Sequence, residues 1–407
     1  MRLIIASTFA TLLILSFLFG FISYRNQNFV YSLIADIYYF FELNKPKHYK
    51  RDYQEIKTLL NDKEFIDYQI LYAREIYDFV KKDPLSFRKE ILKKAILPKE
   101  IVTIKKEELK KNYEFQNLIP KDAFKSLDNK FLINVKYYDI NHFGILEIEN
   151  NNKLFIFNGG QGPSRTPLQY EKFLKLSEEL KKNGYDILSL SITGIGYNRA
   201  QNESITFPSN PNLKTYSNSV NNSFDHLVRG NARYLRHIWL SFYDKNYPEL
   251  LPISLMLSVN YYIIKELENN YDEIIMVGLS GGAWQTTMTS SLIPKIKYSY
   301  AFAGTIPKAF FEASWQPHNL MGGFSKFWNI YDIWHFYFLS LFDENGTQNR
   351  EHNLIYGNKD KCCFFAPYSS SFSNLVNKIS TDGLNVIILK KNDHNIDIDF
   401  LKKKIIN

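Results

Sequence analysis

The sequence predicts an α/β protein built on a mostly parallel, doubly wound sheet. From residue 130 onwards, apolar runs of strand length alternate with helix-compatible stretches. One of these strands ends in a glycine-flanked turn that leads directly into a helix, and polar residues with catalytic potential follow other strands. A chain of 407 residues with 45% hydrophobic content can bury one large core and still carry additional segments.

The first 24 residues are predicted to form a transmembrane anchor. No charged side chain occurs from Leu3 to Phe21, and Arg2 and Arg25 flank this run. Its length is close to the ~20 residues that a helix needs to cross a bilayer. A secretory signal peptide has a shorter apolar region and a cleavage site between small residues, so we expect an uncleaved signal anchor. A buried core helix is the alternative.

The charges beside this run bear on its orientation. Arg2 and the terminal amine lie on one side, and Arg25 lies on the other. The positive-inside rule, by which basic residues beside a membrane helix favour the cytoplasmic side, gives most weight to nearby charge. It favours an N-terminus inside the cytoplasm. We therefore expect a single-pass membrane protein with its catalytic domain outside the cytoplasm.

Residues 25–129 are predicted to form a helical segment. Apolar residues recur at helical spacing between positions 56 and 77, and Pro84, Pro98 and Pro120 punctuate the segment. The charged run Lys105-Lys106-Glu107-Glu108 is interpreted as a solvated helix face. We expect these helices to pack on the core or on the membrane surface.

Residues 130–407 are predicted to form the sheet domain. The opening strands, at 131–140 and 144–149, could pair as a hairpin. The later strands are expected at 154–157, 186–192, 273–277, 298–303, 354–357 and 385–389. Helices are expected at 168–182 and 255–269, with a terminal amphipathic stretch at 396–406.

The most informative motif is Gly278-Leu279-Ser280-Gly281-Gly282. It lies between the apolar strand at 273–277 and a helix-compatible run at 283–288. A serine on such a turn is forced outward by strained backbone, and the glycines on either side let strand and helix approach closely. The pattern alone is weak evidence for a nucleophile, because the alternative is that Ser280 is only a small residue in a tight turn. The strand, turn and helix context favours a nucleophile.

Candidates for a base and its orienting acid follow later, in the order nucleophile, acid, histidine. Asp360 lies in the loop after the strand at 354–357. His394 follows the strand at 385–389 and precedes the terminal amphipathic stretch. The alternatives for these roles are Asp332, Asp343, Asp393, His226 and His237.

A glycine loop, Asn158-Gly159-Gly160, follows the strand at 154–157. With this loop, the motifs above resemble those of the α/β-hydrolase family, over residues 130–407. The resemblance implies that Ser280 is the nucleophile, His394 the base and Asp360 its partner. It also implies an oxyanion hole formed by the backbone N–H groups of Gly160 and Gly281. One departure is Asn158, because the family often has histidine before these glycines.

Two segments interrupt the alternation, at residues 193–252 and 305–350. They are rich in aromatic residues, and in this family insertions at these strand ends form lids and pockets. Aromatic residues make up 16% of the chain, which suggests an apolar pocket for an acyl or alcohol group. The alternative is that the insertions need small cores of their own.

The function implied by the resemblance is that of a serine hydrolase, which cleaves a small-molecule or lipid carboxylic ester through an acyl-enzyme. A serine at the elbow excludes dehalogenases and epoxide hydrolases, which place aspartate there. A membrane-associated acyltransferase is the alternative if the lid excludes water. A catalytically inactive scaffold of the same fold is the alternative from another class of function.

Charge and cysteine content limit the partners of the protein. The net charge of +8 comes from 50 basic and 42 acidic residues spread along the whole chain. No nucleic-acid-binding motif concentrates them, so no nucleic-acid partner is expected. Cys362 and Cys363 are too few for a metal site, and we expect neither a cofactor nor a metal. The sequence does not indicate an oligomeric state.

Overall fold

The computed structural model describes residues 62–116, 126–137, 140–160, 171–191, 253–307, 331–360, 364, 366–390 and 392–406. The predicted anchor at 1–24 and the predicted insertion at 193–252 lie outside the described residues. In the part of the chain that is described, no helix is both long enough and apolar enough to span a bilayer.

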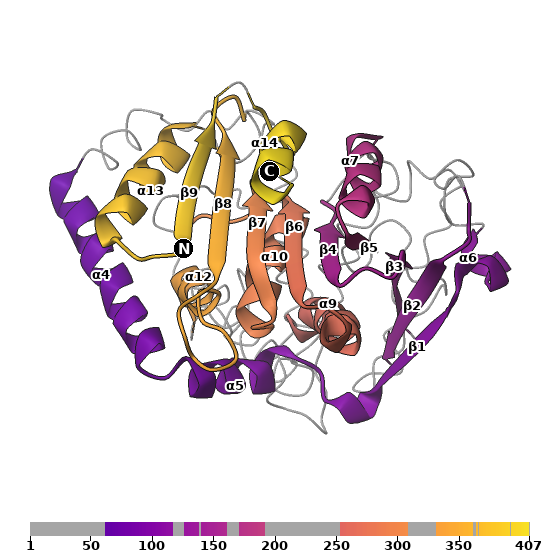
Figure 1. Cartoon of the computed structure of the whole chain (residues 1–407). Coiled ribbons are helices and arrows are strands. Elements are labelled where there is room, and N and C mark those ends of the chain that lie inside the picture. Colours follow the sequence, from indigo (N-terminus) through magenta and orange to yellow (C-terminus); the bar gives the residue numbers. More distant parts are fainter. Residues whose placement is uncertain are drawn as a thin grey trace, which may run out of the picture.

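A nine-stranded sheet forms the centre of the described chain (Figure 1), in the order β1-β2-β3-β5-β4-β6-β7-β8-β9. Strands β5, β4, β6, β7, β8 and β9 run parallel to one another, whereas β1, β2, β3 and β5 are joined by antiparallel pairs. This confirms the predicted mostly parallel sheet and its opening hairpin. The strands are β1 (Val102–Glu108), β2 (Lys130–Tyr137), β3 (Ile140–Glu147), β4 (Lys153–Asn158), β5 (Tyr185–Leu190), β6 (Glu273–Leu279), β7 (Ile296–Phe302), β8 (Glu351–Gly357) and β9 (Leu384–Leu389).

Helices cover both faces of the sheet, because successive residues of its central strands point to opposite sides. In β6, Ile274 and Met276 pack under one helical layer, whereas Ile275 and Val277 pack under the other. The first layer contains α4 (Lys63–Lys82), α5 (Pro84–Ala95), α9 (Ser254–Leu267), α10 (Gly281–Leu292), α12 (Ile333–Leu339) and α13 (Ala366–Ile379). The second contains α7 (Glu171–Lys182) and α14 (Ile398–Ile405). This is the doubly wound arrangement that the sequence predicts.

The N-terminal segment is only partly helical. Helices α4 and α5 lie within it, and Asp62 and Asp83 cap their N-termini by accepting backbone hydrogen bonds. The interpretation of Lys105 to Glu108 as a helix face is wrong, because these residues belong to strand β1, which pairs with β2. An edge strand forms backbone hydrogen bonds to a neighbour on one side, and its side chains can lie in water. Its residues can therefore be charged, without an alternation of apolar and polar residues.

The described part of the predicted second insertion, residues 305–307 and 331–350, also differs from the expectation of a lid. Trp334, Phe336, Tyr337 and Phe338 of α12 are fully buried, and they belong to the main hydrophobic core. Helix α12 therefore lies inside the core of the protein. The rest of this insertion, residues 308–330, lies outside the described residues.

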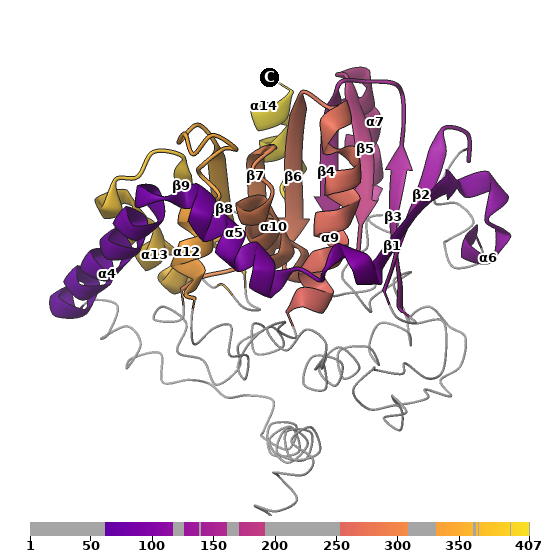
Figure 2. The same ribbon diagram turned by 90° about the horizontal axis from the view of Figure 1, so that it is seen from below.

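Helix α5 is fastened to the core through Arg88, which is buried. Its guanidinium donates hydrogen bonds to the carbonyl oxygens of Ser291 at 2.9 Å, Phe342 at 2.5 Å, Leu339 at 3.2 Å and Asp343 at 3.2 Å. Burial lowers the pKa of Arg88 to about 10. Figure 2 shows α5 running past α10 and α9 on this side of the sheet. The N-terminal helices thus pack on the sheet domain as part of one core.

A second buried arginine, Arg350, also binds carbonyl oxygens at the C-terminal end of α10. Arg350 donates to Ser290 O at 2.6 Å and Ile293 O at 3.2 Å, at the C-terminal end of α10. Terminal helix carbonyls lack partners within the helix, and cations favour this end of the helix dipole. Burial, together with the charge of Arg88, lowers the pKa of Arg350 to about 9. The two arginines therefore fix the far end of the helix that begins at the serine turn.

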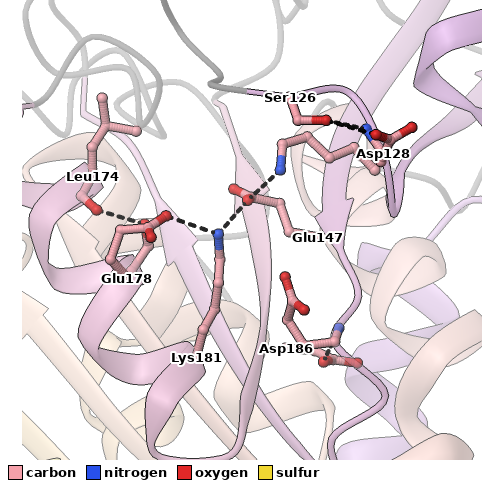
Figure 3. A network of polar contacts seen from close by, with 10 residues as sticks. Ser126, Asp128, Glu147, Leu174, Glu178, Lys181 and Asp186 are labelled. Carbon is pink, nitrogen blue, oxygen red and sulfur yellow. Dashed lines mark hydrogen bonds and ion pairs between the residues drawn. The ribbon is translucent and has the colours of Figure 1, made fainter.

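A polar network joins α7 to the antiparallel strands (Figure 3). Glu147 accepts hydrogen bonds from Lys130 at 2.8 Å and from Lys181 at 2.7 Å, and its side chain is buried. Asp186 accepts from the backbone N–H groups of Glu149 at 2.8 Å and Asn151 at 3.2 Å. Because Asp186 lies at the start of β5, this network belongs to the edge of the sheet where the parallel strands begin.

Candidate active site

The site residues predicted from the sequence follow the ends of parallel strands, and the strand register aligns these ends. Asn158 at the end of β4 pairs with Gly278 of β6, and Gly278 pairs with Ala301 of β7. Gly357 at the end of β8 pairs with Leu389 at the end of β9. The segments that carry Gly160, Ser280, Asp360 and His394 therefore leave the sheet at the same edge, where ligands bind in open α/β sheets.

Ser280 has the strained backbone that the motif predicts. Its φ is 57° and its ψ is −121°, and its side chain is half-buried. A non-glycine residue in such a region costs about 1–3 kcal/mol and is held only where its surroundings impose it. Ser280 N donates to Phe302 O at 2.8 Å, and Trp284 N donates to Ser280 O at 3.0 Å. The turn is thus fixed between β7 and the first turn of α10.

The glycines beside Ser280 are required by close backbone contacts. A Cβ atom at Gly278 would overlap Gly282 O and Thr286 Oγ1. A Cβ atom at Gly282 would overlap the carbonyl oxygens of Asn158 and Gly159. The first contact lets β6 turn sharply into α10, and the second brings α10 against the glycine loop after β4.

The two predicted oxyanion donors are both placed at this junction. Gly281 is the first residue of α10, where a backbone N–H has no acceptor within the helix and the helix dipole favours negative charge. Gly160 is buried two residues after the end of β4. Gly159, which precedes it, donates from its N–H to Leu190 O at 3.1 Å.

Asp360 and His394 are in direct contact. His394 Nδ1 lies 2.7 Å from Asp360 Oδ2, and both side chains are buried. A carboxylate can only accept, so this hydrogen bond requires a proton on Nδ1, and in the neutral imidazole Nε2 is then the acceptor. Among the hydrogen bonds of the described residues, none reaches Nε2. The ring of Phe364 stacks on the imidazole, with centroids 6.4 Å apart.

The loops that carry the acid and the histidine are held together by their backbones. Lys359 N donates to Asn392 O at 2.9 Å. A Cβ atom at Gly357 would overlap the carbonyl oxygens of Asn392 and Asp393. Close packing at Gly357 therefore brings together two loops that lie about thirty residues apart in the chain.

The other aspartates considered as partners of His394 form hydrogen bonds to other groups. Asp393 is exposed and accepts from Asn395 Nδ2, Asp332 caps α12, and Asp343 accepts from the backbone of a turn. His226 and His237 lie outside the described residues. The structure thus joins Asp360 to His394. Within the described part of the chain it shows no hydrogen bond from Ser280 to His394.

A polar pair that the sequence analysis missed lies behind the glycine loop. Asn158 Nδ2 donates to Gln285 Oε1 at 2.9 Å, and Gln285 Nε2 donates to Met256 O at 3.4 Å. Both amide side chains are almost completely buried. The available signal was an amide side chain, five residues after Ser280, in a helix whose other residues are apolar, glycine, serine or threonine.

A metal site was not expected at this edge. In the described ranges, no group of three or more His, Cys, Asp or Glu side chains could hold a metal ion. Cys362 and Cys363 lie outside those ranges.

The sheet order, the strained serine between β6 and α10, and the Asp360–His394 pair after β8 and β9 define an α/β-hydrolase fold. No protein-family model and no curated protein matches the chain. Similar solved structures include acetyl xylan esterase 1 from Thermoanaerobacterium sp. JW/SL YS485, with 11% identity and a TM-score of 0.42 over 82% of this chain and 96% of that chain.

Two further solved structures are similar to this chain. The acetyl xylan esterase from Paenibacillus sp. R4 shows 11% identity and a TM-score of 0.40, over 88% of this chain and 98% of that chain. Est1E from Butyrivibrio proteoclasticus shows 13% identity and a TM-score of 0.38, over 67% of this chain and 95% of that chain.

Proposed function

We propose that the protein is a serine hydrolase that cleaves a carboxylic ester through an acyl-enzyme intermediate. The observation that carries the proposal is the Asp360–His394 hydrogen bond. It leaves Nε2 of the imidazole without a hydrogen-bond partner among the described residues, at the edge of the sheet where Ser280 is held in a strained turn. A base oriented by a carboxylate activates a serine hydroxyl that comes within its reach.

In the proposed reaction, Ser280 Oγ attacks the ester carbonyl carbon and its proton passes to His394 Nε2. For this step the hydroxyl must come within about 2.6–3.2 Å of Nε2, a contact that is often looser before substrate binds. Asp360 stabilises the imidazolium that forms. The N–H groups of Gly281 and Gly160 stabilise the oxyanion, and its collapse expels the alcohol, which takes the proton from His394.

Water then completes the cycle. His394 removes a proton from the water as it attacks the acyl-enzyme, and it returns this proton to Ser280 Oγ when the tetrahedral intermediate collapses and the acid product leaves. An acceptor alcohol in place of water would give a new ester, which is the transferase alternative. We further propose that the substrate is a small-molecule or lipid ester and that residues 1–24 anchor the protein in a membrane, with the catalytic domain outside the cytoplasm. The uncharged run from Leu3 to Phe21 supports the anchor.

The test uses the full chain purified in detergent and p-nitrophenyl acetate as the substrate. Ser280→Ala should reduce kcat/KM by at least about 1,000-fold, because a serine hydrolase has no other nucleophile for the acyl group. Ser290→Ala is the matched control, since this serine lies on α10 and its hydroxyl donates only to Thr287 O among the bonds described. Hydrolysis that persists in Ser280→Ala would contradict the proposal. Ester formation on addition of an alcohol would favour the transferase.

A further inference from the structure

We propose that Asn158 and Gln285 form a positioning pair, which locks the glycine loop after β4 onto the nucleophile helix and so aligns the two oxyanion donors. This inference rests on the proposed function and assigns a role to two side chains that do not touch the substrate. It follows from one hydrogen bond, two close backbone contacts and the burial of both amides.

The two oxyanion donors belong to different elements. Gly281 begins α10, and Gly160 lies in the loop after β4. Their relative position therefore depends on what joins the loop to the helix. Oxyanion stabilisation depends on donors that are already in place before charge develops, so any looseness at this joint reduces it.

The side-chain contact crosses this joint directly. Asn158 Nδ2 donates to Gln285 Oε1 at 2.9 Å, and Gln285 is held in turn by its 3.4 Å hydrogen bond to Met256 O of α9. The chain of contacts thus runs from the loop through α10 to α9. Asn158 is fully buried and Gln285 is 1% exposed, so water does not compete for the bond.

The backbone contact at Gly282 acts at the same place. The carbonyl oxygens of Asn158 and Gly159 lie against this glycine, so the peptide groups just before Gly160 pack on the first turn of α10. This packing limits how close the loop can come but does not prevent it from moving away. The hydrogen bond between Asn158 and Gln285 supplies the attraction that holds it there.

The cost of the pair indicates that it does more than fill space. Asn158 Oδ1 is buried and has no hydrogen-bond partner among the described residues, and a buried polar atom left unpaired costs about 1–3 kcal/mol. Apolar side chains of similar shape would avoid this cost. The pair therefore trades stability for a directional link, and the link lies where the proposed reaction needs one.

The test compares Gln285→Met, which keeps the length of the side chain but removes the acceptor, with Gln285→Glu, which retains an acceptor oxygen. The matched control is Asn353→Ala, which removes another buried amide whose Nδ2 donates to Ser299 O. Three quantities are measured on the full chain: kcat and KM for p-nitrophenyl acetate, the melting temperature, and backbone hydrogen exchange in the peptide that contains Gly159 and Gly160.

We expect Gln285→Met to lower kcat by about 10- to 100-fold, less than the complete loss of one oxyanion donor, with KM changed by less than about 3-fold. Hydrogen exchange at Gly159 and Gly160 should become faster. Gln285→Glu should retain most of the activity at a pH where its carboxyl group is protonated. Asn353→Ala should lower the melting temperature but leave both kcat and the exchange at the loop unchanged.

Unchanged exchange at the loop in Gln285→Met would overturn the proposed link, whether or not the protein is active. Faster exchange with unchanged kcat, or an equal loss of kcat in Asn353→Ala, would overturn its role in catalysis. Absence of any Ser280-dependent hydrolysis in the unmodified protein would instead contradict the proposed function, and the exchange measurement would still decide the link.

Discussion

Replacing Gly282 by alanine should disable catalysis while the protein stays folded. The added Cβ would overlap two backbone oxygens, those of Asn158 and Gly159, and neither can move away by a side-chain rotation. Helix α10 and the glycine loop would have to separate. The proposed oxyanion donors, the N–H groups of Gly281 and Gly160, would then no longer point at one common position.

The size of the effect follows from this geometry. Restoring ordinary contact distances requires a separation of about 1 Å, whereas a catalytic site tolerates errors of about 0.5 Å. A misplacement of about 1 Å can reduce the rate about 100-fold, which corresponds to about 2.7 kcal/mol of transition-state stabilisation. Overpacking of a well-packed core costs about 1–3 kcal/mol of stability, which a large domain can withstand.

The assay is kcat for p-nitrophenyl acetate together with the melting temperature from circular dichroism. Gly184→Ala is the control. Gly184 has a φ of 84° in the turn between α7 and β5, and apart from its chain neighbours no heavy atom of the described residues lies within 4 Å of an added Cβ. It should lose about 1 kcal/mol of stability through backbone strain and retain full activity. A Gly282→Ala variant with unchanged kcat would refute the claim that this contact sets the oxyanion geometry.

Three further predictions concern the acid, the buried arginine and the buried histidines. Asp360→Asn should lower kcat about 1,000-fold or more in the ester assay, because the amide no longer fixes the imidazole tautomer; a loss below about 10-fold would contradict its role. Arg88→Met should lower the free energy of unfolding in urea by about 2–4 kcal/mol by leaving buried carbonyls unpaired, whereas the exposed Arg74→Met should lose less than about 1 kcal/mol. Burial lowers the pKa of His142 and His352 to about 3, so below about pH 6.5 the unfolded chain binds protons that the native protein does not. The free energy of unfolding should be constant above that pH and should fall as the pH drops towards 3, by up to about 1.4 kcal/mol per pH unit for each histidine. In urea unfolding, the free energy of His352→Gln should depend less steeply on pH. An unchanged pH dependence would contradict the lowered pKa of His352.

The parts of the site that could be predicted from the sequence are those with a local signature. The turn at Ser280 is fixed by glycines within two residues of it, and His394 is marked by the strand that precedes it. The strands of the parallel sheet could be predicted because both of their faces are buried, which makes them continuous apolar runs. The contact between Asp360 and His394 follows once the strand order is known.

The parts that could not be predicted depend on contacts between distant residues. Strand β1 has no apolar alternation, because its backbone bonds to β2 decide its structure and its charged side chains face water. Nothing near Arg88 in the sequence indicates that it caps carbonyls more than 200 residues away. Gln285 looks like an ordinary helical residue until the fold brings Asn158 beside it.

The proposed reaction depends on Ser280 being the nucleophile. The most direct measurement is the mass of the full chain after treatment with a fluorophosphonate, followed by peptide mapping of the adduct. We predict one adduct per chain, located on Ser280, formed at a rate that falls sharply in His394→Ala and absent in Ser280→Ala. An adduct on another residue, or labelling of Ser280→Ala at the rate of the unmodified protein, would contradict the account.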